Sequence, residues 1–242
     1  MKDKIIYAFL FSALLLTGST AIAQDDAAAV TTGFKFGVRI GATVSEFSSS
    51  QPHTSEKLGF IGGAIVEYAF SEQFSVLSEP SYMQMGGQFV RFTDNTRFGD
   101  DSPLAKYATS SKVTASYGDI PVLAKYSLPA IGNFKPNIVA GGSIGLLIGA
   151  NDTFDRTYFY GQDYFTVHES ENVSSEYESY QVGATGGIGG EVSLGGTKRL
   201  LIDFRYRYGL TPAKKSFSYI DLNDVQGDLY TNSFYFTVGF GF

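Results

Sequence analysis

The chain has 242 residues and an acidic balance, with 18 Lys and Arg against 24 Asp and Glu and a formal net charge of -6. It contains no cysteine, which excludes disulfides, thiol chemistry and cysteine-based zinc sites. Basic residues are dispersed rather than clustered, so we expect no nucleic-acid partner, and no motif points to a cofactor.

The N-terminus resembles an export signal. Lys2 and Lys4 precede an apolar run from Ile5 to Leu16, and Ala21-Ile22-Ala23 forms an A-x-A cleavage site. An uncleaved membrane anchor is the alternative, but the run is short for a spanning helix. The sequence therefore predicts a signal peptide over 1–23, cleaved after Ala23, a short segment over 24–32 and a single domain over 33–242.

Eight later segments alternate between large apolar residues and small or polar ones, which is the period-2 pattern of β-strands. In chain order they cover about 34–40, 60–70, 74–82, 120–128, 136–148, 180–192, 200–208 and 234–242. None of the large apolar phases contains a charged residue. No segment after the N-terminus has the roughly 18 uninterrupted apolar residues of a transmembrane helix, which excludes an α-helical membrane protein.

All strand charges fall in the opposite phase, and they balance at five basic and five acidic side chains. The interior of an eight-stranded barrel is only wide enough for side chains to fill, so charges there must pair. We therefore predict a structural lumen charge network of Lys35, Arg39, Glu67, Glu79, Asp119, Lys125, Glu191, Asp203, Arg205 and Arg207.

The connections between these segments alternate between long and short. Long ones cover 44–57, 87–112, 151–178 and 210–230, and short ones 71–73, 129–134 and 195–198. Soluble sandwiches and lipocalin-type barrels have no reason to alternate in this way. The pattern predicts an all-β fold: an eight-stranded antiparallel up-and-down transmembrane β-barrel with short periplasmic turns and long extracellular loops.

The C-terminal strand ends on an aromatic residue, which resembles the recognition signal that outer-membrane barrels present to their assembly machinery. The residues of this predicted assembly signal are Phe234, Phe236, Val238, Phe240 and Phe242. A soluble edge strand explains this segment equally well when it is taken alone, so the assignment depends on the rest of the chain.

The connection over 151–178 has a local net charge of -6 and an aromatic cluster that includes Tyr158 and Phe165. One interpretation is a solvated loop that keeps the chain soluble in transit. The other is a contact surface for a basic or cation-bridged partner, such as lipopolysaccharide or a neighbouring protein.

Evidence for an active site or metal site is weak, and we predict neither. His53 lies near Ser49 and Ser50, and His168 near Ser170, but the spacing matches no catalytic motif. A lipid-modifying enzyme built on either histidine remains an alternative. The acidic series of Asp221, Asn223, Asp224 and Asp228 lacks the spacing and glycine of a calcium loop.

The run Tyr117-Gly118-Asp119-Ile120-Pro121-Val122-Leu123-Ala124-Lys125-Tyr126 resembles a strand of PorT-like outer-membrane β-barrel proteins. Weaker matches are Glu79-Pro80, Lys135-Pro136 and Phe204-Arg205-Tyr206. The resemblance implies an eight-stranded barrel integral to the bacterial outer membrane. It also implies that Asp119 and Lys125 face the lumen and that Pro121 marks a bulge or bend.

Some members of that family are tied to protein secretion, and the family brings no catalytic motif. We therefore expect a non-enzymatic structural or interaction protein, in contact with outer-membrane lipid, lipopolysaccharide and the assembly machinery, with a possible protein partner at the long loops. A role accessory to secretion and a small-solute channel remain alternatives.

Overall fold

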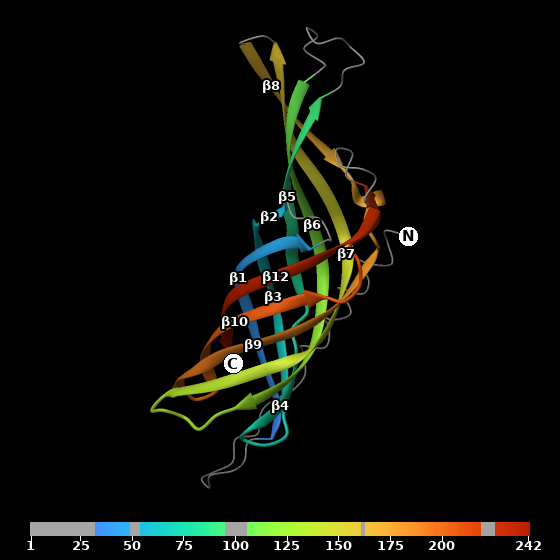
Figure 1. The fold of residues 1–242 in the computed structure, drawn as a ribbon. Coiled ribbons are helices and arrows are strands. Elements are labelled where there is room, and N and C mark those ends of the chain that lie inside the picture. The colour runs from blue at the N-terminus through green and yellow to red at the C-terminus, as the bar shows by residue number, and fades with distance from the viewer. Residues whose placement is uncertain (1–31, 49–53, 95–105, 161–162, 219–225) are drawn as a thin grey trace. The chain divides into compact units, whose positions relative to one another are not determined.

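The computed structural model describes residues 32–48, 54–94, 106–160, 163–218 and 226–242 (Figure 1). The predicted signal peptide and residues 24–31 lie outside this range. The elements are β1 Gly33–Ser48, β2 Thr54–Ser55, β3 Lys57–Ala69, β4 Phe74–Ser78, β5 Ser81–Asp94, β6 Lys106–Ser127, β7 Phe134–Tyr160, β8 Asp163–Asn172, the 3-10 helix η2 Ser174–Glu176, β9 Tyr180–Gly195, β10 Lys198–Gly209, β11 Lys214–Ser218 and β12 Gln226–Gly241. No helix in these ranges is long and apolar enough to span a membrane.

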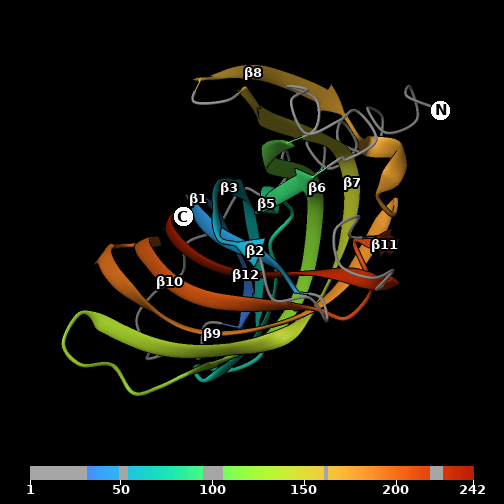
Figure 2. The same ribbon diagram turned by 45° about the horizontal axis from the view of Figure 1, so that its top comes forward.

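The strands close into a ring of 8 antiparallel positions, which confirms the predicted fold class. β1 pairs with β3 on one side and with β12 on the other, so the first and last strands seal the barrel. From β3 the ring continues through β4 and β5, which share one position, to β6, β7, β9, β10 and β12 (Figures 1 and 2). Each position of the ring therefore has a neighbouring strand on both sides, and the ring has no free edge, as a hydrocarbon environment requires.

Large apolar side chains point away from the lumen, in the predicted phase. On β12, Phe236 and Phe240 are 48% and 40% exposed. Tyr235 and Thr237, on either side of Phe236 in the sequence, are buried. Phe34, Ile40, Ile138 and Phe204 repeat this exposure on other strands. In water such a continuous apolar surface is unstable, so it indicates a wall that faces lipid.

Two prolines lie where the ladder is interrupted. The strand predicted over 74–82 is divided into β4 and β5 at Glu79-Pro80. β6 pairs with β5 as far as Asp119 and with β4 from Val122 onward. Pro121 therefore lies opposite the break between β4 and β5. Proline has no N–H to donate, and it fits here without loss of a ladder hydrogen bond. Pro121 itself remains in register with β7, so of the predicted bulge or bend the register excludes a bulge at this residue.

A bulge does occur nearby, where the β6–β7 register shifts between Ser116 and Tyr117. The extra β7 residue is Ile148, which is 58% exposed, while Ala150 is fully buried. Because one inserted residue inverts the side-chain alternation, β7 beyond the bulge directs its odd-numbered side chains outward.

The predicted long loops are largely strand, which corrects the expected boundaries. The segment over 151–178 continues β7 to Tyr160 and returns as β8, and β5 and β6 extend in the same way. We call residues 88–94, 106–114, 151–160 and 163–172 the extension; Figure 1 shows it rising beyond the ring. Thr and Ser are frequent in the extension. In paired strands their backbone N–H and C=O groups find hydrogen-bond partners that an isolated loop does not supply.

The lumen at the long-connection end contains an apolar cluster beside buried polar side chains such as Lys57 and Gln181. A buried cluster there comprises Phe47, Ile61, Met83, Met85, Val113, Ala115, Tyr117, Ala150, Val173, Tyr177, Ala213, Leu229 and Tyr235. Tyr177 follows η2, so the segment between β8 and β9 contributes to this cluster. The barrel interior therefore combines a charged part with a hydrophobic one.

Candidate functional site

The charged side chains of the lumen form three groups along β10, whose inward residues include Arg199, Arg205 and Arg207. Alternation directs every second residue of β10 inward, so these guanidinium groups are spaced along the barrel axis. Acidic partners come from other strands of the ring.

The first group lies toward the short turns. Lys125 Nζ is 3.0 Å from Glu67 Oε1, and it also contacts Glu191. Arg199 Nη1 bridges the same two carboxylates, at 2.7 Å from Glu67 Oε2 and 3.0 Å from Glu191 Oε2. Ser75 Oγ donates a further hydrogen bond to Glu67 at 2.7 Å. Two cations are thus matched by two anions from four different strands.

The second group surrounds Glu79, which is almost fully buried. Arg205 binds both oxygens of this carboxylate, with Nη2 donating to Oε1 at 2.9 Å. Arg39 Nη1 lies 2.7 Å from Glu79 Oε2, and its Nη2 donates to Ser81 Oγ at 3.0 Å. Asp203 Oδ1 lies 3.1 Å from the same Nη2 atom of Arg205, as a second ion-pair partner. A fork-shaped guanidinium is suited to this bidentate contact.

The third group lies next to the apolar cluster. Arg207 Nε is 3.6 Å from Asp119 Oδ1 and donates to Ser143 Oγ at 3.1 Å. Its Nη1 also contacts Met85 Sδ at 3.8 Å. Gly183 makes room for this group, because a Cβ at that position would lie 2.8 Å from Arg207 Cζ.

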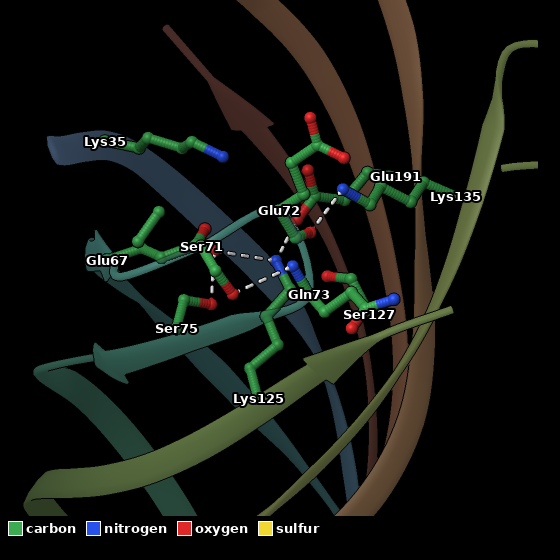
Figure 3. A pocket seen from close by; sticks show the side chains of 11 residues that line it. Lys35, Glu67, Ser71, Glu72, Gln73, Ser75, Lys125, Ser127, Lys135 and Glu191 are labelled. Carbon is green, nitrogen blue, oxygen red and sulfur yellow. Dashed lines mark hydrogen bonds and ion pairs between the residues drawn. The ribbon is translucent and has the colours of Figure 1, made fainter. Parts of the chain in front are cut away.

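Lys35 lies at the mouth of the barrel, beside a polar cavity of about 60 Å³ (Figure 3). The side chain extends toward the other lining residues, which include Glu67, Lys125 and Glu191. A second, deeper cavity of about 10 Å³ reaches from Glu67 to Arg205. The larger space holds a few waters and the smaller one at most a single water, and neither is a passage for a solute.

All ten predicted side chains therefore project into the lumen, nine of them within the three groups and Lys35 at the mouth. Sequence reasoning missed Arg199, which is buried in the first group. The strand was expected to begin at Leu200, although Arg199 shares the odd-numbered phase of Arg205 and Arg207. Arg199 raises the predicted set of ten to six basic and five acidic residues, so the expected neutrality is not met. Lys57, the first residue of β3, is also buried and lies near Gly86.

Among the described residues, no histidine–serine pair forms a catalytic arrangement. His168 Nδ1 is 2.5 Å from Asp155 Oδ1 on an exposed part of the extension. Ser170 lies two residues along the same strand, and the hydrogen bonds of His168 do not include it. His53, with Ser49 and Ser50, lies outside the described residues.

The described residues also contain no group of three or more His, Cys, Asp or Glu side chains that is able to hold a metal ion. Of the acidic series near the C-terminus, only Asp228 falls within the described ranges.

Comparison with known proteins gives the family. Residues 22–215 match the outer membrane protein beta-barrel domain. This chain belongs to that family. It is an integral β-barrel protein of the outer membrane, and the exposed apolar wall faces lipid.

Several solved structures of small outer-membrane barrels are similar to this family member. The neisserial surface protein NspA is 14% identical, with 86% of this chain and 97% of that chain covered and a TM-score of 0.40. OprG from Pseudomonas aeruginosa is 15% identical, with 87% and 97% covered and a TM-score of 0.42. Ail, the attachment invasion locus protein of Yersinia pestis, is 14% identical, with 87% and 99% covered and a TM-score of 0.35. A search of the curated proteins found no match.

Proposed function

We propose that this outer-membrane barrel is a closed, non-enzymatic scaffold that presents the extension to partners outside the cell. The short turns face the periplasm and the long connections face outward, as is usual for bacterial barrels. The occluded lumen carries the proposal: paired charges fill one part and an apolar cluster fills another, and the two cavities beside the charged groups measure only about 60 and 10 Å³.

The lumen charge network has a structural role in this proposal. Buried ions are tolerated when each has a partner and its remaining hydrogen-bonding groups are satisfied. Glu79, in the break between β4 and β5, contacts Arg39 of β1 and Arg205 of β10. The network then fixes the register of the wall rather than conducting or binding a solute.

Conductance of the purified protein in planar lipid bilayers tests this proposal against a small-solute channel. We expect no stable open current, with a sixteen-stranded porin as the positive control, because such porins keep an aqueous channel. A stable, voltage-insensitive current from the folded protein would overturn the closed-scaffold proposal.

The interaction role is tested by crosslinking in intact cells, with a photoreactive group placed on the extension at Thr153 and, as a control, at Glu72 in a short turn. We expect a surface protein to be captured from Thr153 and not from Glu72. Equal capture at both positions would contradict a role for the extension.

The resemblance of the Tyr117–Tyr126 run to PorT-like proteins motivates a second proposal, a role accessory to protein secretion. Deletion of the gene, followed by measurement of the secreted proteins, tests it; an unchanged set of secreted proteins would refute it. The C-terminal residues Phe234 to Phe242 are proposed as the signal read by the assembly machinery.

A further inference from the structure

The outer side of β8 is an open sheet edge. In the part of the chain that the structure describes, β8 ends the sheet order and pairs with β7 alone. It is a strand of 10 residues, about 33 Å long at 3.3 Å per residue. Natural edge strands are commonly protected by proline, lysine or a bulge. β8 has none of these, and its register with β7 is unbroken.

The hydrogen bond at the C-terminal end of β8 shows which of its residues bond to β7 and which direct their backbone groups to the open side. Val173 N donates to Ala150 O at 2.9 Å, in continuation of the β7–β8 register. Bonding toward the partner strand alternates along an antiparallel ladder, so odd-numbered residues of β8 bond to β7. The paired hydroxyls of Thr157 and Thr166, 2.9 Å apart, occupy the other phase. Five residues therefore direct their N–H and C=O groups to the open side: Tyr164, Thr166, His168, Ser170 and Asn172.

The charge of the β7–β8 hairpin is strongly negative. Its described residues 151–160 and 163–172 contain five carboxylates and a single arginine, Arg156. Three of the carboxylates lie on β8 itself, at the exposed residues Asp163, Glu169 and Glu171. They share one phase, so basic side chains at alternate positions of an adjacent strand would lie opposite them.

We propose that the open edge of β8 binds an extended polypeptide segment that carries Lys or Arg at alternate positions, as an added strand of the sheet. This inference deepens the proposed interaction role and rests on it. Main-chain hydrogen bonds to the five open residues supply affinity, and the carboxylates select for basic side chains.

Other occupants fit this edge less well. A second copy that pairs antiparallel about Val167 would place Asp163 opposite Glu171, and like charges directly opposite are destabilising. Anionic lipopolysaccharide is repelled by the same carboxylates. An extended basic segment of another protein supplies both backbone hydrogen bonds to the open side of β8 and positive charge opposite its carboxylates.

Peptide binding to the folded full-length chain in detergent tests the proposal. The probe is a fluorescent ten-residue peptide of alternating Lys and Thr, and its matched controls are a Glu–Thr peptide and the same Lys–Thr peptide N-methylated at alternate residues. N-methylation retains the charge and removes the N–H groups needed for strand addition. We expect saturable binding of the Lys–Thr peptide, at least tenfold weaker binding after N-methylation, and none with Glu–Thr.

Variants of the chain provide the second arm. Glu169→Gln with Glu171→Gln should weaken binding of the Lys–Thr peptide by about tenfold. The matched control is Glu46→Gln with Glu56→Gln, which removes the same charge from exposed residues outside β8 and should leave binding unchanged. Ser170→Pro removes one N–H on the open side and leaves the β7 ladder intact, so it should also weaken binding.

Equal affinity of the N-methylated peptide would overturn strand addition and leave only charge attraction. Absence of Lys–Thr binding up to about 1 mM, which corresponds to about -4 kcal/mol, would also overturn it. The peptide series decides the question even where Ser170→Pro fails to fold. Neither result affects the conductance test, so failure of this inference is distinguishable from failure of the closed-scaffold proposal.

Discussion

Arg205 and Glu79 are 126 residues apart in the chain, yet Arg205 Nη2 donates to Glu79 Oε1 at 2.9 Å inside the lumen. The same carboxylate contacts Arg39, so Glu79 is the shared anion of two buried guanidinium groups. Removal of such an anion leaves uncompensated charge in a buried interior, so this contact should be sensitive to substitution.

Substitution of Glu79 by Gln should therefore destabilise the barrel by about 3–5 kcal/mol, the usual cost of breaking a buried ion pair. Urea unfolding of the protein in lipid vesicles measures this free energy. Glu72→Gln is the control, because Glu72 is exposed in the turn between β3 and β4 and should change stability by less than about 0.5 kcal/mol. Equal stabilities for the two variants would show that the Glu79 contacts contribute nothing.

Gly41 is required for closure between β1 and β12. A Cβ at this position would lie 1.9 Å from Phe236 O, which belongs to the neighbouring backbone and has no room to move. Gly41→Ala should destabilise the barrel by about 1–3 kcal/mol, as overpacking does. Gly142→Ala is the matched control, because its nearest atom, Gly183 O, lies 3.6 Å away. The temperature at which the folded band disappears in unheated gels ranks the two variants, and a lower value for Gly142→Ala would contradict the argument.

The lipid-facing assignment is tested by a charge on the outer wall. Phe236→Arg exposes a guanidinium to hydrocarbon and should cost about 2–4 kcal/mol near the membrane midplane. Thr153→Arg places the same group on the exposed outer face of the extension and should be nearly neutral. Yields of folded protein in the outer-membrane fraction compare them. If Phe236→Arg accumulates as well as Thr153→Arg, the wall does not face lipid at that position.

The C-terminal residue separates folding from assembly. Phe242 N donates to Phe36 O at 3.0 Å, and the ring is 54% exposed. Phe242→Ala keeps this backbone bond, so refolding in detergent should be nearly unchanged. We expect a severalfold loss of folded barrel in cells, measured as the heat-modifiable band in the outer-membrane fraction. Phe34→Ala, which removes an exposed aromatic at the start of β1, is the control. An equal effect of both substitutions would argue against a C-terminal recognition signal.

Alternation made the barrel wall predictable. Because successive side chains of a strand point to opposite faces, the sequence predicts that Phe236 points outward and Thr237 inward, and no partner strand has to be known. The same rule would also have placed Arg199 in the lumen, since it shares the phase of Arg205; only the start of the strand, at Lys198, was set two residues too late. Where a bulge inverts the phase, as at Ile148, no feature of the sequence marks the inserted residue.

The connections were predictable in length and not in structure. Their polar composition is typical of loops, and the strands β8 and β11 within them were missed. Backbone pairing across 106–116 and 149–158 is a non-local event, and propensity over a few residues carries little information about it.

The amino-acid sequence by itself determined an eight-stranded barrel, its outward apolar face and the inward direction of its charges, because side-chain direction in a strand is a local property. Only the tertiary structure decided which charges meet, that Glu79 bridges Arg39 and Arg205, and that an apolar cluster packs in the far part of the lumen. It alone showed that, among the described strands, β8 pairs on one side only. These are relationships between residues far apart in the chain, and they arise from the register in which the strands close the ring.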